Sequence, residues 1–258
     1  MKPWPYPLWL AHRGAGKLAP ENTLAAFRVG AGFGYRAFEC DVKLSRDGEA
    51  FLLHDDTLER TSSGQGSPAE QDWAALARLD GGAWHSPPYT GEPLPRFAQI
   101  AAFCQANGCA LNIEIKPCPG EDARTGAAVA REAARLWAGA VVPPLLSSFQ
   151  PDALAAARDT EPTLPRGLLL DELWAGWQEA AEALGVVAVI TNWRLIDRSL
   201  IEQLHARGWR ALVYTVNDAA VAERLIADGI DGIITDAVDR LGPAAGPEAA
   251  IGSALRYD

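Results

Sequence analysis

Two carboxylates and a histidine lie close together in the segment 36–56, RAFECDVKLSRDGEAFLLHDD. In a strand, side chains two positions apart share a face, so Glu39 and Asp41 would point one way and Cys40 the other. Neighbouring carboxylates repel each other unless a cation or a proton lies between them. With His54 one short hairpin away, the segment indicates a metal-assisted active site. Taken alone, it also fits a polar strand end with solvated charges.

Polar residues also close the other predicted strands. They are His12 and Arg13, Glu114 and Lys116, Ser147 and Ser148, Asn192, Asn217 and Asp236. In a parallel α/β barrel the carboxyl ends of the strands form one face, and active sites lie there. We therefore expect these side chains to gather around one mouth together with the carboxylates of segment 36–56.

Glu114 supplies the third carboxylate of a predicted cation site. It shares a strand face with Lys116, in the same alternation that joins Glu39 to Asp41. Ligation by oxygen alone suits a hard cation, so we expect one divalent ion, Mg²⁺ or Ca²⁺, bound by the three carboxylates. A surface ion pair between Glu114 and Lys116 is the alternative.

The two histidines at this mouth, His12 and His54, are candidates for a general acid and a general base. Arg13 and Lys116 would supply positive charge to an anionic group, and a guanidinium can bind phosphate through two parallel hydrogen bonds. Asp55 either orients His54 or caps the turn.

The elements that must position these residues alternate regularly after Pro95. Besides the hairpin of segment 36–56, strands are predicted over 7–12, 109–115, 144–149, 166–170, 186–191, 210–216 and 232–235, and helices over 97–107, 121–138, 151–158, 173–184, 197–207 and 218–228. Eight strands with intervening helices indicate an α/β protein with a closed (β/α)8 TIM barrel. The alternative is an open doubly wound sheet, although no G-x-G-x-x-G follows the first strand to favour its nucleotide-binding form.

The chain is predicted to be one domain over 1–258, with an insertion at about 56–95 and a loose C-terminal tail from about 241. The insertion is rich in turn residues and long for a plain loop, which favours a lid or wall of the site. A short helix is expected in it near 72–79, and its aromatic residues would form either an apolar mouth or a small core.

The bulk composition restricts the partners. A formal net charge of -10 argues against non-specific nucleic-acid binding, and no apolar run reaches the length of a membrane span. The N-terminal apolar stretch is broken by Pro3, Pro5 and Pro7 and is too short for a signal-peptide core, so we expect a cytoplasmic protein. The four cysteines show no CxxC spacing and are expected to be free thiols. The oligomeric state is open.

Short motifs follow one another in a fixed order along the chain. They are His12-Arg13-Gly14 with Glu21-Asn22-Thr23, Glu39-x-Asp41, His54-Asp55, Glu114-Ile115-Lys116, Ser148-Phe149, Thr215-Val216-Asn217 and Gly232-Ile233-Ile234-Thr235-Asp236. This ordered set resembles the glycerophosphodiester phosphodiesterases, over nearly the whole chain to about Asp236. Tyr214 departs from the pattern, because many relatives carry Trp at this position. The difference affects a residue expected in the wall of the glycerol pocket.

The resemblance implies a (β/α)8 barrel with a small insertion after the second strand. It also implies metal-dependent hydrolysis of glycerophosphodiesters to sn-glycerol 3-phosphate and an alcohol. The implied roles are acid and base for His12 and His54, divalent-metal ligation for Glu39, Asp41 and Glu114, and substrate binding for Arg13, Lys116 and Asn217. A hypothesis for the mechanism is in-line attack by a glycerol hydroxyl, followed by opening of a cyclic phosphate by water.

Two other functions remain open at this point. A related phosphodiesterase could act on lysophospholipids, for which Trp73, Trp84 and Tyr89 of the insertion would have to form an exposed apolar mouth. A non-catalytic glycerophosphate-binding protein is the other alternative. Such a protein is expected to lack a histidine or a metal carboxylate, whereas this chain keeps the full set.

Overall fold

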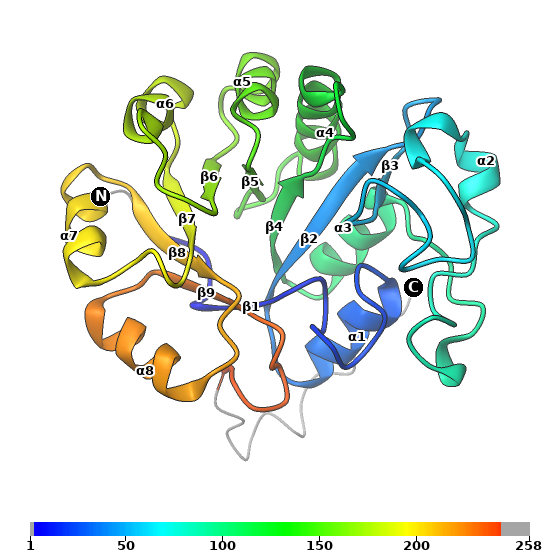
Figure 1. Ribbon diagram of the computed structural model, residues 1–258, viewed down its shortest axis with the longest axis horizontal. Coiled ribbons are helices and arrows are strands. Elements are labelled where there is room, and N and C mark those ends of the chain that lie inside the picture. The colour runs from blue at the N-terminus through cyan, green and yellow to red at the C-terminus, as the bar shows by residue number, and fades with distance from the viewer. Residues whose placement is uncertain (1–2, 244–258) are drawn as a thin grey trace.

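The computed structural model describes residues 3–243 and shows a closed barrel of eight parallel strands surrounded by helices (Figure 1). The barrel strands are β1 (Trp9–Ala11), β2 (Ala37–Leu44), β4 (Ala110–Ile115), β5 (Leu145–Ser148), β6 (Arg166–Leu170), β7 (Ala188–Asn192), β8 (Arg210–Tyr214) and β9 (Gly232–Thr235). β1 pairs in parallel with both β2 and β9, which closes the barrel. The predicted (β/α)8 barrel is confirmed, and the open sheet is wrong.

The barrel strands are buried on both faces, as their nearly continuous apolar runs predict. Every residue of β2 is buried. Cys40 and Val42 pack outward into the main hydrophobic core beneath the helices. The register sets Glu39 opposite Asn112 and Asp41 opposite Glu114, so polar side chains of two neighbouring strands share the inward face.

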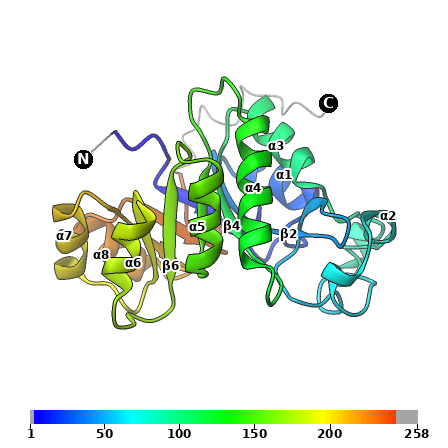
Figure 2. The same cartoon turned by 90° about the horizontal axis from the view of Figure 1, so that it is seen from above.

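The helices form a ring outside the strands, and Figure 2 shows α4 and α5 side by side along the barrel. They are α1 (Leu24–Gly32), α3 (Phe97–Ala106), α4 (Asp122–Leu136), α5 (Pro151–Thr160), α6 (Trp177–Leu184), α7 (Arg198–Ala206) and α8 (Ala219–Asp228). The helix predicted from residue 173 begins only at Trp177. Gly176 has a φ of 91°, a left-handed backbone that cannot continue into the preceding residues as a helix.

The insertion begins after β3 (Ala50–Leu52), which pairs antiparallel with β2 through the predicted Asp47-Gly48 turn. It contains α2 (Trp73–Leu76) and the 3₁₀ helices η1 (Pro68–Glu70) and η2 (Pro87–Tyr89), so the helix expected near 72–79 is only four residues long. A small core holds it together, made of Phe51, Leu53, Leu58, Trp73, Leu76 and Leu94. Trp73 therefore belongs to this core and does not form an exposed mouth.

Further features of the fold concern the C-terminal tail, the cysteines, and the length and apolar content of the helices. The Tyr35 hydroxyl donates to the Leu241 carbonyl, so the start of the expected tail is attached, and the rest of that tail lies outside the described residues. All four cysteines are buried and free, as predicted. Within residues 3–243, no helix combines the length and the apolar content needed to cross a bilayer.

Gly30 of α1 tests how tightly the first helix packs on the first loop. An added Cβ would come within 2.1 Å of the Gly14 carbonyl oxygen, whereas Gly32 of the same helix has nothing within 4 Å. We expect Gly30→Ala to lower the free energy of unfolding by about 1–3 kcal/mol through overpacking. Gly32→Ala should raise it by up to about 1 kcal/mol, because alanine is the better helix former. Equal effects in denaturant unfolding would contradict the close approach.

Candidate active site

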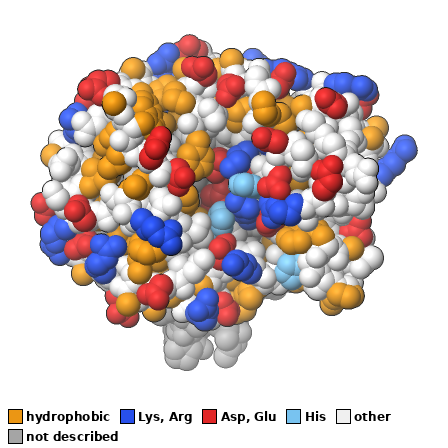
Figure 3. Space-filling model, in the orientation of Figure 1, with side chains coloured by type: hydrophobic (Ala, Val, Ile, Leu, Met, Phe, Trp, Pro, Cys, Tyr) orange, Lys and Arg blue, Asp and Glu red, His pale blue; other side chains and the backbone are white. Residues whose placement is uncertain are grey.

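A cavity of about 400 Å³ opens at the carboxyl ends of the barrel strands, the face at which barrels of this kind carry their chemistry. Its lining consists of His12, Arg13, Glu39, His54, Asn112, Glu114, Lys116, Phe149, Leu169, Asp171, Tyr214, Thr215 and Ile234. Figure 3 shows histidine, acidic and basic side chains gathered around a central hollow. Of the strand-end residues expected around one mouth, six line this cavity: His12, Arg13, Glu39, His54, Glu114 and Lys116. Ser147, Ser148 and Asn192 do not line it.

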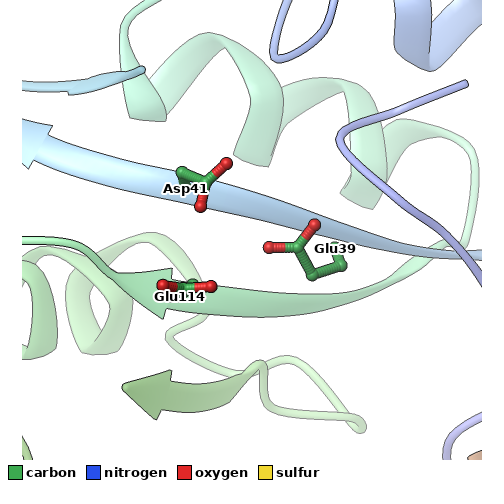
Figure 4. Close-up of side chains that lie close together, drawn as sticks. All are labelled: Glu39, Asp41 and Glu114. Carbon is green, nitrogen blue, oxygen red and sulfur yellow. The ribbon is translucent and has the colours of Figure 1, made fainter. Parts of the chain in front are cut away.

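Three carboxylates converge beside this cavity, as the strand alternation predicts. Glu39 and Asp41 project from β2 and Glu114 projects from β4, as Figure 4 shows. One oxygen from each lies within 4.8 Å of the others. All three residues are buried, with exposed fractions of 3%, 1% and 8%. The cluster could bind a metal ion.

The electrostatics of the cluster fit a cation. Burial and the charges of Asp41 and Glu114 raise the pKa of Glu39 well above its usual value. Burial and Asp41 raise the pKa of Glu114 to about 7, whereas Arg13 and Lys116 overcome burial and lower the pKa of Asp41 to about 2.

Several buried polar atoms of the site make no hydrogen bond within the described part of the chain. Glu39 Oε1, Asp41 Oδ1 and both amide atoms of Asn112 have no hydrogen-bond partner among residues 3–243. Buried polar atoms are normally paired, so these oxygens have lone pairs available for a bound ion or its water. Oxygen donors in this number are what Mg²⁺ and Ca²⁺ prefer.

Arg13 is fixed from three sides. Its Nη1 donates to Glu21 Oε1 at 2.7 Å, its Nε lies 3.2 Å from Asp41 Oδ2, and its backbone N–H donates to Glu39 Oε2 at 3.1 Å. Its φ of 51° is a left-handed conformation that costs energy outside glycine, and the surrounding contacts hold it. Asn22, with a φ of 59°, bonds Asp41 through both amide atoms.

Lys116 belongs to the site and not to a surface ion pair. Its Nζ donates to Glu114 Oε1 at 2.8 Å, lies 3.8 Å from Asp41 Oδ1, and stands 5.5 Å from the centroid of the Phe149 ring. Burial opposes its charge, but Glu114 and Asp41 outweigh burial and raise the pKa of Lys116. An ammonium group and a guanidinium therefore both face the carboxylates.

Each of the two histidines is held by a carboxylate. His12 Nδ1 lies 2.6 Å from Asp236 Oδ1, and His54 Nδ1 lies 2.6 Å from Asp55 Oδ1. An ionised aspartate only accepts, so Nδ1 donates in both pairs and Nε2 remains available to a reacting group. The contact of Asp55 with His54 fits the first of its two expected roles, orientation of His54.

The protonation of these pairs follows from their surroundings. Hydrogen bonds from Arg60 outweigh burial and lower the pKa of Asp55. Burial, with Arg13 and Lys116, lowers the pKa of His54 despite the opposing charge of Asp41. These effects favour the neutral form of His54, which has a lone pair on Nε2.

Asn217 does not line the cavity and contacts Asp236, which holds His12. Its Nδ2 donates to Asp236 Oδ2 at 3.0 Å, and its Oδ1 accepts from the Asp236 backbone N–H at 2.8 Å. The structure thus places Asn217, which the sequence predicts as a substrate ligand, behind the carboxylate that holds His12. No role was predicted for Asp236 from the sequence. Its position directly after the last barrel strand was the signal that could have placed it at the site.

A (β/α)8 barrel with two oriented histidines and three buried carboxylates at its C-terminal face has the groups needed for metal-assisted hydrolysis of an anionic ester. The model of the glycerophosphoryl diester phosphodiesterase family matches residues 12–240. The chain belongs to this family and is a hydrolase, a glycerophosphodiester phosphodiesterase.

Relatives of known name and structure agree. The chain is 30% identical over 236 residues to a glycerophosphodiester phosphodiesterase of Caldanaerobacter subterraneus subsp. tengcongensis, covering 89% of this chain and 93% of the relative. It is similar to an Oleispira antarctica phosphodiesterase solved in complex with the product sn-glycerol-3-phosphate, with a TM-score of 0.85, 31% identity, and 96% and 98% of the two chains covered. A glycerophosphodiester phosphodiesterase from Agrobacterium tumefaciens has a TM-score of 0.76 at 25% identity, covering 90% and 97%.

Proposed function

We propose that this enzyme hydrolyses glycerophosphodiesters to sn-glycerol 3-phosphate and an alcohol, with one divalent cation, Mg²⁺ or Ca²⁺, and with His12 and His54 as acid and base. The observation that carries the proposal is the pair of histidines, each bound at Nδ1 by an aspartate and each lining the cavity that borders the three carboxylates. The product bound by the Oleispira antarctica relative supports the substrate class.

The charges of the site suit a phosphodiester. Glu39, Asp41 and Glu114 are acidic, and Arg13 and Lys116 are basic, so the described cluster has more acidic than basic groups. A divalent cation reverses that balance and makes the site attractive to an anion. Arg13 and Lys116 are then the protein groups that bind the phosphate oxygens.

The cation, when bound, screens the phosphate charge and lowers the pKa of a coordinated hydroxyl. One histidine removes the proton of a glycerol hydroxyl as its oxygen bonds to phosphorus. The other donates a proton to the alkoxide whose bond to phosphorus breaks. Water then opens the resulting cyclic phosphate, with the two histidines exchanging roles. The lowered pKa of His54 favours it as the first base.

Release of glycerol 3-phosphate from glycerophosphocholine tests the function. We expect turnover that is lost after exhaustive chelation with EDTA and restored by adding Mg²⁺ or Ca²⁺, because the carboxylates cannot organise the phosphate without a cation. Coupled oxidation of glycerol 3-phosphate measures the product. Activity that survives removal of all bound metal, checked by elemental analysis, contradicts the cation. A lysophospholipid that is cleaved while glycerophosphocholine is not would assign the enzyme to the alternative substrate class.

A further inference from the structure

Arg60 joins the two sides of the active site through one guanidinium group. It lies in the insertion, after His54 and before η1. Its Nη1 and Nη2 donate to the two oxygens of Glu21, both at 2.8 Å. Its Nε and Nη2 donate to the two oxygens of Asp55, at 2.5 and 2.8 Å. A single planar group therefore binds two carboxylates, each through two hydrogen bonds.

Both carboxylates also hold a side chain that lines the cavity. Glu21 accepts from Arg13 Nη1 at 2.7 Å, and Asp55 contacts His54 Nδ1 at 2.6 Å. The contacts form a continuous chain that runs from Arg13 to Glu21, Arg60, Asp55 and His54. Its two ends are the proposed phosphate ligand and the proposed base.

The contribution of Arg60 is geometric. Its side chain is 45% exposed and that of Asp55 is 27% exposed, so solvent screening leaves the Arg60–Asp55 ion pair little effect on stability. Glu21, which is 14% exposed, keeps its ion pair with Arg13 when the Arg60 guanidinium is removed. A bidentate guanidinium nevertheless fixes the plane of the carboxylate it binds. Since Asp55 has only the χ1 and χ2 torsions to set, fixing its plane also fixes the direction of the bond to His54.

The insertion is anchored independently of Arg60. His85 Nε2 contacts the Lys17 carbonyl at 3.0 Å, and Glu92 Oε1 accepts from the Ala25 backbone N–H at 3.0 Å. These contacts hold the insertion against the segment between β1 and α1, which carries Arg13 and Glu21, and against the first turn of α1. Removing the Arg60 guanidinium is therefore expected to leave the insertion in place.

We propose that Arg60 is a positioning residue, which acts through Asp55 to orient His54 and through Glu21 to orient Arg13. This inference rests on the proposed function. It gives the insertion a role in catalysis, because the insertion supplies the group that ties the histidine loop to the β1–α1 segment.

Arg60→Gln tests the proposal, with Arg78→Gln as the matched control in the same insertion, where Arg78 is exposed. We expect Arg60→Gln to lower kcat on the order of tenfold to a hundredfold, as misorientation of a catalytic group does, with a smaller change in KM. The melting temperature should stay at the wild-type value. Arg60→Lys should recover part of the loss, because an ammonium group keeps the charge but cannot bind both carboxylates bidentately. Wild-type kcat in Arg60→Gln overturns the proposal.

A double-mutant cycle with Asp55→Asn separates positioning from a general structural role. If Arg60 acts through Asp55, Arg60→Gln should lower kcat far less in the Asp55→Asn background than in the wild type. Fully multiplicative effects overturn the proposal.

The proton NMR signal of His54 Nδ1–H, assigned by its loss in His54→Gln, should shift in Arg60→Gln and not in Arg78→Gln. This NMR readout needs no substrate. If the wild-type enzyme lacked glycerophosphodiesterase activity, the proposed function would be refuted, but the shift of the His54 signal would still decide the role of Arg60.

Discussion

Replacing His12 or His54 by Ala is expected to lower kcat for glycerophosphodiester hydrolysis by about a thousandfold at saturating cation. Each substitution removes a ring whose Nδ1 is bound by an aspartate and whose Nε2 is the proposed proton-transfer atom. In the proposed mechanism one histidine deprotonates the nucleophile and the other protonates the leaving alkoxide, so neither can replace the other in the first step. Single-turnover and steady-state release of glycerol 3-phosphate measure the effect.

His205→Ala is the matched control, since His205 lies on α7, contacts Asp231 and does not line the cavity. It should keep wild-type turnover. Near-wild-type activity in His12→Ala or His54→Ala would remove that residue from the mechanism. Circular dichroism and the melting temperature must match the wild type for either variant to be informative, because Asp236 and Asp55 lose a partner.

Glu39→Gln is expected to move cation affinity and apo-protein stability in opposite directions. Affinity for Mg²⁺ or Ca²⁺ should fall on the order of a hundredfold, because the variant replaces a charged ligand by a neutral one. The free energy of unfolding in EDTA should rise by about 1–3 kcal/mol, because Gln avoids the cost of burying or protonating a carboxylate beside Asp41 and Glu114. Calorimetric titration with the ion and urea unfolding in EDTA give the two values.

Glu202→Gln is the control for this charge change, since Glu202 is exposed on α7. It should leave both cation affinity and stability at the wild-type values. Wild-type affinity in Glu39→Gln would exclude Glu39 as a ligand. A simultaneous loss of affinity and of apo stability would instead show that Glu39 supports the fold, for example by accepting from the Arg13 backbone N–H.

The sequence by itself predicted the parts of the site that depend on local periodicity. Alternation along a strand places Glu39 and Asp41 on one face whatever the rest of the chain does, and the structure confirms the carboxylate cluster with Glu114. The eight strands follow equally from apolar runs separated by helical segments. The start of α6 was predicted too early, because a pattern of apolar residues does not indicate the left-handed backbone of Gly176.

Only the tertiary structure decided which groups hold the two histidines and Arg13 in place. Asp236 reaches His12 because barrel closure sets β9 beside β1, from opposite ends of the chain. Arg60 meets Glu21 because the insertion folds back on the segment after β1. Such contacts depend on loop paths and side-chain directions, which no short-range pattern encodes. Local sequence therefore determined which residues face the mouth, and long-range packing determined how they are oriented there.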